Sequence, residues 1–304
     1  MPSFYEYISY IQFLPTATMG PYLEYREFDN YLKQENQYAN IPDQLSQVLR
    51  NFLEAIVHLM VYMVLYLQVF PVEFMATEGY QQLSWPASIF YAWMSVTFIR
   101  FKYYFAWKLS SCSVDACGIS YSGSTVGKEG NLVHNWDLIQ TCNAWEVETT
   151  LHIRDKIKNW NMSVQQWLTR CVYIRYRTPE EYKTDKKAQS RGQLIVFAVS
   201  AFWHGFYFGY YLSFFFWYCL MQVAGVVFRI NRNRPDLVAK YEATGKVGHI
   251  GMWLLVNVTF SYFGSYFQLM GVKSCFASMS HLWFMPEIIV LALMFGLQNS
   301  KLAR

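Results

Sequence analysis

The sequence GQLIVFAVSAFWHGFYFGYYLSFFFWYCLMQVAGVVF, residues 192–228, contains no Asp, Glu, Lys or Arg. As one helix these 37 residues would be about 55 Å long, far more than a hydrocarbon core of about 30 Å. We expect the glycines Gly205 and Gly209 to break it, so that His204 ends one apolar helix and residues 210–228 form a second. Irregular backbone at membrane depth is tolerated only where it lines protein or a water-filled cavity. His204 is therefore predicted to face an interior chamber.

Four further runs are long and apolar enough to cross a bilayer, which needs about 20 predominantly apolar residues. They are residues 55–72, 79–99, 247–272 and 274–300. Period-2 alternation is absent, and lipid contact forces backbone polar groups to pair internally, so we expect helices. The sequence predicts an all-α, multi-pass integral membrane bundle with one broken or re-entrant helix around an internal chamber.

The composition indicates a membrane protein and argues against a soluble globular domain and a nucleic-acid-binding protein. Apolar residues make up 54% of the chain and charged residues only 15%, against about 25% in typical soluble domains. The net charge of +4 and the lack of any nucleic-acid motif argue against nucleic-acid binding. The six cysteines lack CxxC spacing, so free thiols are expected and no metal site is predicted.

The polar middle of the chain, residues 110–191, begins as a Gly- and Ser-rich loop. Apolar residues then recur at steps of three and four over residues 153–171, which predicts an amphipathic helix near the membrane surface or over the chamber. Asn161 falls on its apolar side. Its basic residues are expected to point away from that side, and they are Arg154, Lys156, Lys158 and Arg170.

Two charged segments, residues 175–191 and 229–246, flank the broken apolar hairpin. We expect them to share one face of the membrane. Basic residues accumulate on the cytoplasmic side of membrane proteins, so this face is predicted to be cytosolic.

Two motifs in the second half of the chain carry a family resemblance. NWNMSVQQWLTRCVYIRY (159–176) followed by SAFWHGFYFGYYLSF (200–214) resembles the membrane-bound O-acyltransferase family, and most closely its lysophospholipid acyltransferase branch. MGPYLEYREFDNY (19–31) and RFKYYFAW (100–107) match in the same order. The resemblance implies a helical bundle with a catalytic His and Asn, which are His204 and Asn161 here. Family members usually carry Pro where this chain has Phe208, which leaves the position of the bend open.

The resemblance also bears on domain organisation. Members have several transmembrane helices before the Gly-Pro segment, and this chain begins almost at it. We expect a single domain over residues 1–304 that lacks those helices. A fragment, a short gene model and a reduced member of the family remain open as interpretations.

The chemistry of acyl transfer suits these residue types. A hydroxyl that attacks a thioester must lose its proton, and imidazole has an unperturbed pKa near neutrality. Apolar surroundings disfavour imidazolium, so His204 would act as a neutral base. The carboxamide of Asn161 could stabilise the developing oxyanion, or could instead orient the hydroxyl or the imidazole.

The implied substrates are acyl-CoA and a lysophospholipid, with no cofactor beyond acyl-CoA as co-substrate. The residues expected to contact substrate are Trp160, Trp167, Trp203, Lys186, Lys187 and Arg191. The basic members would attract the phosphates of coenzyme A. The expected location is the endoplasmic reticulum membrane, in phospholipid remodelling, and the oligomeric state stays open, homo-oligomers included.

Three alternatives remain. A protein- or sterol-acylating member of the same family would differ at the acceptor entrance, which the sequence does not reveal. A non-catalytic transporter could also place a His and an Asn at a helix break, although no internal inverted repeat is found. A membrane scaffold without activity is the third alternative.

Overall fold

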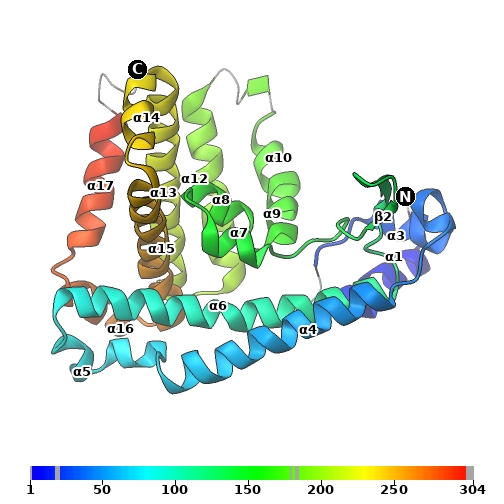
Figure 1. Cartoon of the computed structure of the whole chain (residues 1–304), viewed down its shortest axis with the longest axis horizontal. Coiled ribbons are helices and arrows are strands. Elements are labelled where there is room, and N and C mark those ends of the chain that lie inside the picture. The colour runs from blue at the N-terminus through cyan, green and yellow to red at the C-terminus, as the bar shows by residue number, and fades with distance from the viewer. Residues whose placement is uncertain (1, 18–20, 179, 182–184, 299–304) are drawn as a thin grey trace. The chain divides into compact units, whose positions relative to one another are not determined.

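The computed structural model describes residues 2–17, 21–178, 180–181 and 185–298. These residues form two compact units, and each is described by itself. The first comprises Met1–Val64, Arg100–Ala144 and Trp160–Trp167, and the second comprises Leu65–Ile99, Trp145–Asn159 and Leu168–Arg304. The long helix α6 (Trp85–Ala116) contributes residues to both (Figure 1).

The first unit is mostly helical, with one small hairpin. Its elements are α1 (Phe4–Ile11), α2 (Leu14–Ala17), α3 (Tyr25–Leu32), the 3-10 turn η1 (Asn36–Ala39), α4 (Leu45–Val61) with part of the π turn η2 (Tyr62–Tyr66), residues 100–116 of α6, β1 (Gly123–Val126), β2 (Leu132–Asn135) and α9 (Met162–Leu168).

Residues 21–31, the described part of the Gly-Pro segment, contribute to the core of the first unit. Leu23 and Phe28 pack with Val114 and Ile119 in one buried apolar cluster. Two tyrosines bond to the chain just after α6. Tyr31 donates a 2.8 Å hydrogen bond to the carbonyl of Cys117, and Tyr38 donates a 3.1 Å bond to the carbonyl of Ile119. This segment is therefore tied to the end of α6, which follows the RFKYYFAW motif.

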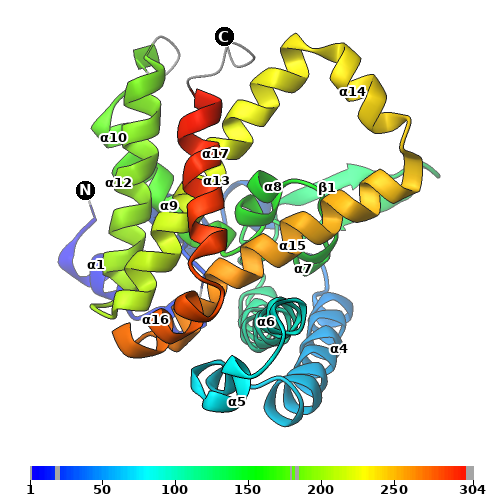
Figure 2. The ribbon, with the colours of Figure 1, turned by 90° about the vertical axis from the view of Figure 1, so that its left-hand side faces the viewer.

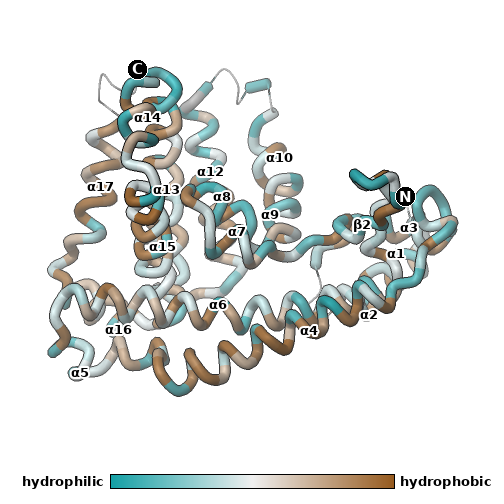
Figure 3. Tube along the Cα trace, in the orientation of Figure 1, coloured by the Kyte–Doolittle hydropathy of each residue, from teal (hydrophilic) through white to brown (hydrophobic). Residues whose placement is uncertain are grey.

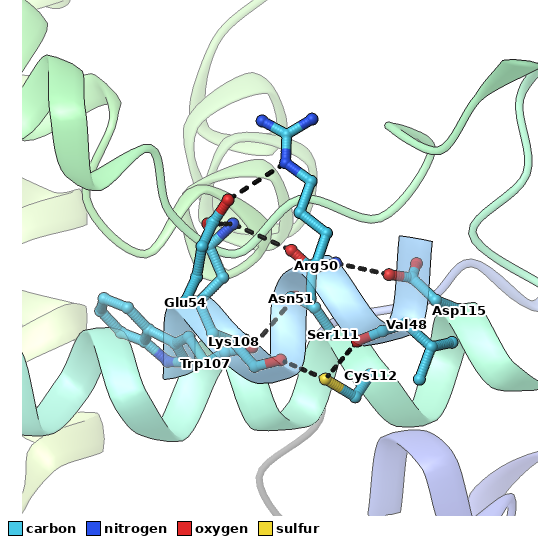
Figure 4. A network of polar contacts seen from close by, with 9 residues as sticks. All are labelled: Val48, Arg50, Asn51, Glu54, Trp107, Lys108, Ser111, Cys112 and Asp115. Atoms are coloured by element: carbon cyan, nitrogen blue, oxygen red, sulfur yellow. Dashed lines mark hydrogen bonds and ion pairs between the residues drawn. The ribbon is translucent and has the colours of Figure 1, made fainter. Parts of the chain in front are cut away.

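Polar side chains join α4 to α6 within the first unit (Figure 4). The ammonium of Lys108 lies 2.6 Å from the Glu54 carboxylate and donates a 3.0 Å hydrogen bond to the side-chain carbonyl of Asn51. The Asn51 amide donates in turn to Asp115, at 2.6 Å. Asp115, the buried charge of this group, is thus hydrogen-bonded, as buried charges must be.

The hairpin was not expected, since residues 110–137 read as loop. β1 and β2 pair antiparallel, with Ser124 opposite His134 and Val126 opposite Leu132. The Ser124 hydroxyl lies 2.7 Å from Nδ1 of His134. Four-residue strands are too short to give a clear alternating pattern, so the Gly- and Ser-rich composition dominated the prediction.

The second unit is built around α13 (Phe208–Asn233), which packs against α12 (Lys186–His204), α15 (Gly245–Leu269) and α17 (Met285–Gln298), as Figure 2 shows. Its remaining elements are the 3-10 turn η3 (Val72–Ala76), α5 (Glu78–Gln81), residues 85–99 of α6, α7 (Ala144–Thr149) from Trp145 onward, α8 (Ile153–Lys158), the π turn η4 (Thr169–Tyr173), α10 (Ile174–Tyr176), α14 (Pro235–Glu242) and α16 (Val272–His281).

Two helices in the described residues, Leu45–Tyr66 and Phe208–Asn233, are long and apolar enough to cross a membrane, or up to three if a bent pair counts as one span. Figure 3 shows apolar residues along most of α4. The apolar run predicted over residues 274–300 forms two helices within the described residues, because α16 and α17 meet at an 84° bend, and the pair is a broken span or a re-entrant loop. Trp283 and Phe284 adopt positive φ there, which an α-helix does not allow.

The predicted amphipathic helix over residues 153–171 is also wrong as one element. It is divided into α8 and α9, because Asn161 takes a φ of 49° between them. Lys156 was expected to point outward, yet its side chain is 0% exposed. Its ammonium donates to the carbonyl of Val147 and to Asn257, the latter at 2.6 Å. Periodicity reports the apolar face of a helix, but not the polar partners that a distant helix supplies.

Candidate functional site

Helix α12 ends at His204 because the next residue leaves helical geometry. Gly205 has φ 121° and ψ −169°, a conformation open in practice only to glycine. Its N–H donates a 3.1 Å hydrogen bond to the carbonyl of Phe202. Helix α13 starts three residues later at Phe208. The predicted break at Gly205 is therefore confirmed, and Phe208 opens a helix in place of the family's proline.

The His204 imidazole lies among aromatic rings. Its ring centroid is 5.3 Å from that of Phe214, in a stacked arrangement, and 4.9 Å from that of Phe267, edge to face. Trp203 and Tyr210 complete the surroundings at 4.7 and 5.8 Å. Among the described residues, no side chain or carbonyl forms a hydrogen bond with either ring nitrogen. The rings hold the imidazole in place while its nitrogens remain available for a reactant.

Gly209 does not break the helix, contrary to expectation, and instead brings α13 against the end of α15. Its N–H donates a 2.8 Å hydrogen bond to the carbonyl of Met270. A Cβ atom at this position would overlap the carbonyl oxygen of Tyr266 and lie 2.9 Å from the Met270 Cα. One turn later, the Ser213 hydroxyl donates a 2.7 Å bond to the carbonyl of Phe263. These contacts hold α15 beside the break that carries His204.

The other end of the α12–α13 hairpin is held by polar side chains. Ser190 is 2.8 Å from the Tyr218 hydroxyl and donates a 3.0 Å hydrogen bond to Gln222. Gln222 donates a further 2.8 Å bond to Gln193. The start of α12 and the end of α13 therefore lie at the same end of this antiparallel pair, as expected for the two charged segments that flank it.

The basic residues predicted to attract acyl-CoA lie at this end. Lys187 and Arg191 are exposed on the first turns of α12. The backbone of Lys186 begins the helix, and its side chain lies outside the described residues. Asp185 caps the helix by accepting hydrogen bonds from the N–H groups of Ala188 and Lys187, which lowers the pKa of its carboxyl. Arg191 is thirteen residues before His204, about 20 Å along a helix.

Asn161 occupies a left-handed position that its residue type favours. Its φ is 49°, and Asn adopts such angles more readily than other non-glycine residues. Its carbonyl accepts a 3.1 Å hydrogen bond from the Gln165 N–H, while the next N–H, that of Met162, donates to Thr141 at 2.7 Å. In the part of the chain that the structure describes, its carboxamide has no hydrogen-bond partner. The backbone is held and the side chain is available.

The three predicted tryptophans have different surroundings. Trp160 packs within the first unit, with its ring 4.8 Å from Trp107 and 5.5 Å from Tyr103. Trp203 is 55% exposed and contacts the His204 ring. Trp167 is half-buried on α9. Trp203 is thus the one placed beside the imidazole, whereas Asn161 and His204 belong to different units.

An arginine pair in the second unit was missed by the sequence reasoning. Arg154 of α8 and Arg229 of α13 both cover Gly225, with guanidinium nitrogens 3.7 and 4.0 Å from where its Cβ would be. The Arg154 guanidinium also lies over the Phe228 ring, at 5.6 Å. Neither arginine forms an ion pair or hydrogen bond within the described ranges. Two cations this close favour an anion between them. The only signal in the sequence was a glycine interrupting bulky residues at 225.

This chain is similar to a known family of membrane enzymes and to several of its members. The family model of the membrane-bound O-acyltransferases matches residues 1–267. The lysophospholipid acyltransferase 6 of Drosophila melanogaster is 33% identical over 70% of this chain and 30% of its own length. The lysophospholipid acyltransferase of Saccharomyces cerevisiae is 28% identical over 95% of this chain and 48% of its own length. The human membrane-bound glycerophospholipid O-acyltransferase 1 is 26% identical over 95% and 58%. The chain thus spans about half the length of the curated relatives it matches, or less.

Proposed function

This chain belongs to the membrane-bound O-acyltransferase family, and from that premise we propose that it transfers a fatty acyl group from acyl-CoA to the free hydroxyl of a lysophospholipid. The proposed setting is phospholipid remodelling in the endoplasmic reticulum membrane. The names of the three relatives support this acceptor class over a protein or a sterol.

The availability of two side chains carries the proposal. The imidazole of His204 and the carboxamide of Asn161 have no hydrogen-bond partner among the described residues, although each has a well-held backbone. Both side chains are half-buried, and neither contributes a fully buried polar atom that lacks a partner. Their polar atoms are therefore open to a substrate.

In the proposed reaction, His204 is the general base. The lysophospholipid hydroxyl attacks the thioester carbonyl carbon while the imidazole takes the hydroxyl proton. The Asn161 carboxamide donates a hydrogen bond to the carbonyl oxygen as it gains negative charge. The C–S bond then breaks, the thiolate leaves and the imidazolium returns the proton to it, giving phospholipid and free coenzyme A.

The basic end of the hairpin suits the donor. We propose that Arg154 and Arg229, with Lys187 and Arg191, attract the phosphates of coenzyme A. Since α12 places Arg191 about 20 Å from His204, an extended donor is required to bring its thioester from that end to the imidazole. Acyl-CoA has this form, because a flexible arm separates its phosphates from its thioester.

The test is acyl transfer in membranes that contain the full chain. Lysophospholipids, a sterol and an acceptor peptide are offered with several acyl-CoAs, and products are read by mass spectrometry. We expect phospholipid product from the wild type, a loss of about 10²–10⁴-fold for His204→Ala, and little change for His249→Ala, which alters a partly exposed histidine distant in sequence from the break. Product from the sterol or the peptide alone would overturn the acceptor, and a fully active His204→Ala would overturn the base.

A further inference from the structure

Glu287 is the only charged residue that the sequence places between 274 and 300, and its side chain is buried. It lies in the first turn of α17, directly after the bend that separates α16 from α17. One carboxyl oxygen accepts hydrogen bonds from Tyr266 and, at 3.1 Å, from Tyr262. The other oxygen is buried and has no hydrogen-bond partner in the described residues. A carboxyl group in an apolar membrane protein interior is costly and marks a functional position.

Both tyrosines belong to the last turns of α15. They are one turn apart, fully buried, and present their hydroxyls to α17. Without the Glu287 oxygen, two buried hydroxyls would lose their acceptor, and a buried polar group without a partner destabilises the packing around it. Glu287 therefore holds this end of α15 on its α17 side.

A neighbouring side of the same helix end faces the His204 break, because Phe263 and Phe267 each follow one of the two tyrosines along the helix. Gly209 lies against the carbonyl of Tyr266 and bonds to Met270, and Ser213 bonds to Phe263. Between these contacts, the Phe267 ring lies edge to face with the imidazole, at 4.9 Å. A shift or rotation of the α15 end would move this ring against His204.

We propose that Glu287 is a positioning residue which, through Tyr262 and Tyr266, fixes the end of α15 and thereby the orientation of the Phe267 ring against His204. Its role in turnover rests on the proposed acyl transfer. Its effect on the imidazole does not, because the contacts lie within the second unit. A structural role alone would change how much protein folds, but not the state of His204 in the folded fraction.

The experiment compares Glu287→Gln with Glu287→Leu in the full chain. Gln keeps an oxygen that accepts from both tyrosines, whereas Leu has similar volume and no acceptor. The double variant Tyr262→Phe with Tyr266→Phe removes the same bonds from the other side. Ser190→Ala is the matched control, because it removes interhelical hydrogen bonds at the far end of the α12–α13 hairpin.

The first readout does not depend on activity. Folded protein in detergent is treated with diethyl pyrocarbonate, and modification of His204 is followed by mass spectrometry with the partly exposed His249 as internal reference. We expect Glu287→Leu and the double Tyr variant to change the His204 rate several-fold, and Glu287→Gln and Ser190→Ala to leave it as in wild type. An unchanged rate in Glu287→Leu would overturn the proposal, whether or not the chain transfers acyl groups.

The second readout is kinetic and applies where the wild type is active. We expect Glu287→Leu to lower kcat by up to about 100-fold, the loss that a displacement of about 1 Å can cause, with KM for acyl-CoA unchanged. Glu287→Gln should restore kcat to near the wild-type value. A higher KM with normal kcat, or no rescue by Gln, would contradict positioning. An inactive wild type with the expected labelling pattern would instead count against the proposed function alone.

Discussion

At the scale of single residues, backbone conformation explains why particular side chains stand at the candidate site. His204 is the last residue of α12 because Gly205 takes a conformation that only glycine adopts readily. Asn161 takes a left-handed conformation that divides α8 from α9. Asn suits this position for two reasons: it tolerates the left-handed backbone angle, and it supplies the carboxamide of the proposed reaction. Substitution can separate the two.

Asn161→Gly and Asn161→Ala both remove the carboxamide, but only Ala is strained at φ 49°. We expect both to lower kcat strongly with little change in acyl-CoA affinity. Asn161→Ala should also lose about 1 kcal/mol of stability relative to Asn161→Gly. Turnover in membranes and thermal unfolding in detergent check this. An active Asn161→Gly would show that Asn161 serves the backbone only.

Gly205→Ala tests the break itself. The nearest atom to a new Cβ is 3.8 Å away, so space is available and only the backbone angle opposes the substitution. We expect a cost of about 1–3 kcal/mol and a loss of turnover, because α12 would end differently and move His204. The matched control is Gly251→Ala in α15, which meets nothing within 4 Å. Equal effects of the two substitutions on turnover would contradict this role of Gly205.

At the scale of elements, the second unit depends on close helix contacts and on one buried cation. Gly209 allows the start of α13 to touch the backbone at the end of α15. Lys156 fastens α8 to α15 by bonding to Asn257, and it also lies near the Phe260 ring. Both contacts join segments that lie far apart in the sequence.

Gly209→Ala should separate α13 from α15, because the new Cβ would overlap the backbone rather than a movable side chain. We expect a destabilisation of about 3 kcal/mol or more. Gly251→Ala, in an open helical position, should instead stabilise by about 0.5–1 kcal/mol. Unfolding midpoints in detergent measure both. If the two midpoints agree, the close approach at Gly209 does not contribute to stability.

Lys156→Met should destabilise the second unit by about 2 kcal/mol, because Val147 and Asn257 lose the donor of their buried hydrogen bonds. Adding Asn257→Leu removes one orphaned acceptor and should recover part of the loss. Lys158→Met, at an exposed position on the same helix, is the control. Thermal unfolding of the wild type, the two single variants and the double variant measures these changes. A double variant less stable than Lys156→Met would contradict this account.

At the scale of the whole molecule, the candidate residues are distributed between the two units. Asn161 belongs to the first, with the Gly-Pro segment and the end of α6, whereas His204 and the basic end of the hairpin belong to the second. Within the second unit, the donor is proposed to extend from the basic end of the hairpin to His204. The arginine pair at Gly225 provides the sharpest test of that route.

Arg154→Gln combined with Arg229→Gln should raise the KM for acyl-CoA about tenfold while kcat is retained, because the pair would bind phosphate and not the thioester. The salt dependence of KM should flatten as well, since exposed charges are screened. Lys187→Gln combined with Arg191→Gln tests the residues that the sequence suggested, and Arg232→Gln is an exposed control on α13. An unchanged KM and salt response in the first pair would remove it from the donor site.

The sequence by itself determined the features that local composition controls. The uncharged run 192–228 predicts a broken apolar hairpin, and Gly205 marks its break, because length and glycine conformation are properties of neighbouring residues. The order of motifs identified the family and so the two candidate side chains, His204 and Asn161.

Only the tertiary structure decided which distant groups meet. Lys156 is buried because Asn257, 101 residues away, accepts its hydrogen bond. Arg154 lies beside Arg229 because α8 packs on α13 at a glycine, and the buried Glu287 bonds to two tyrosines because α17 turns back after an 84° bend. Periodicity describes one face of one helix, whereas these contacts depend on how separate helices pack together.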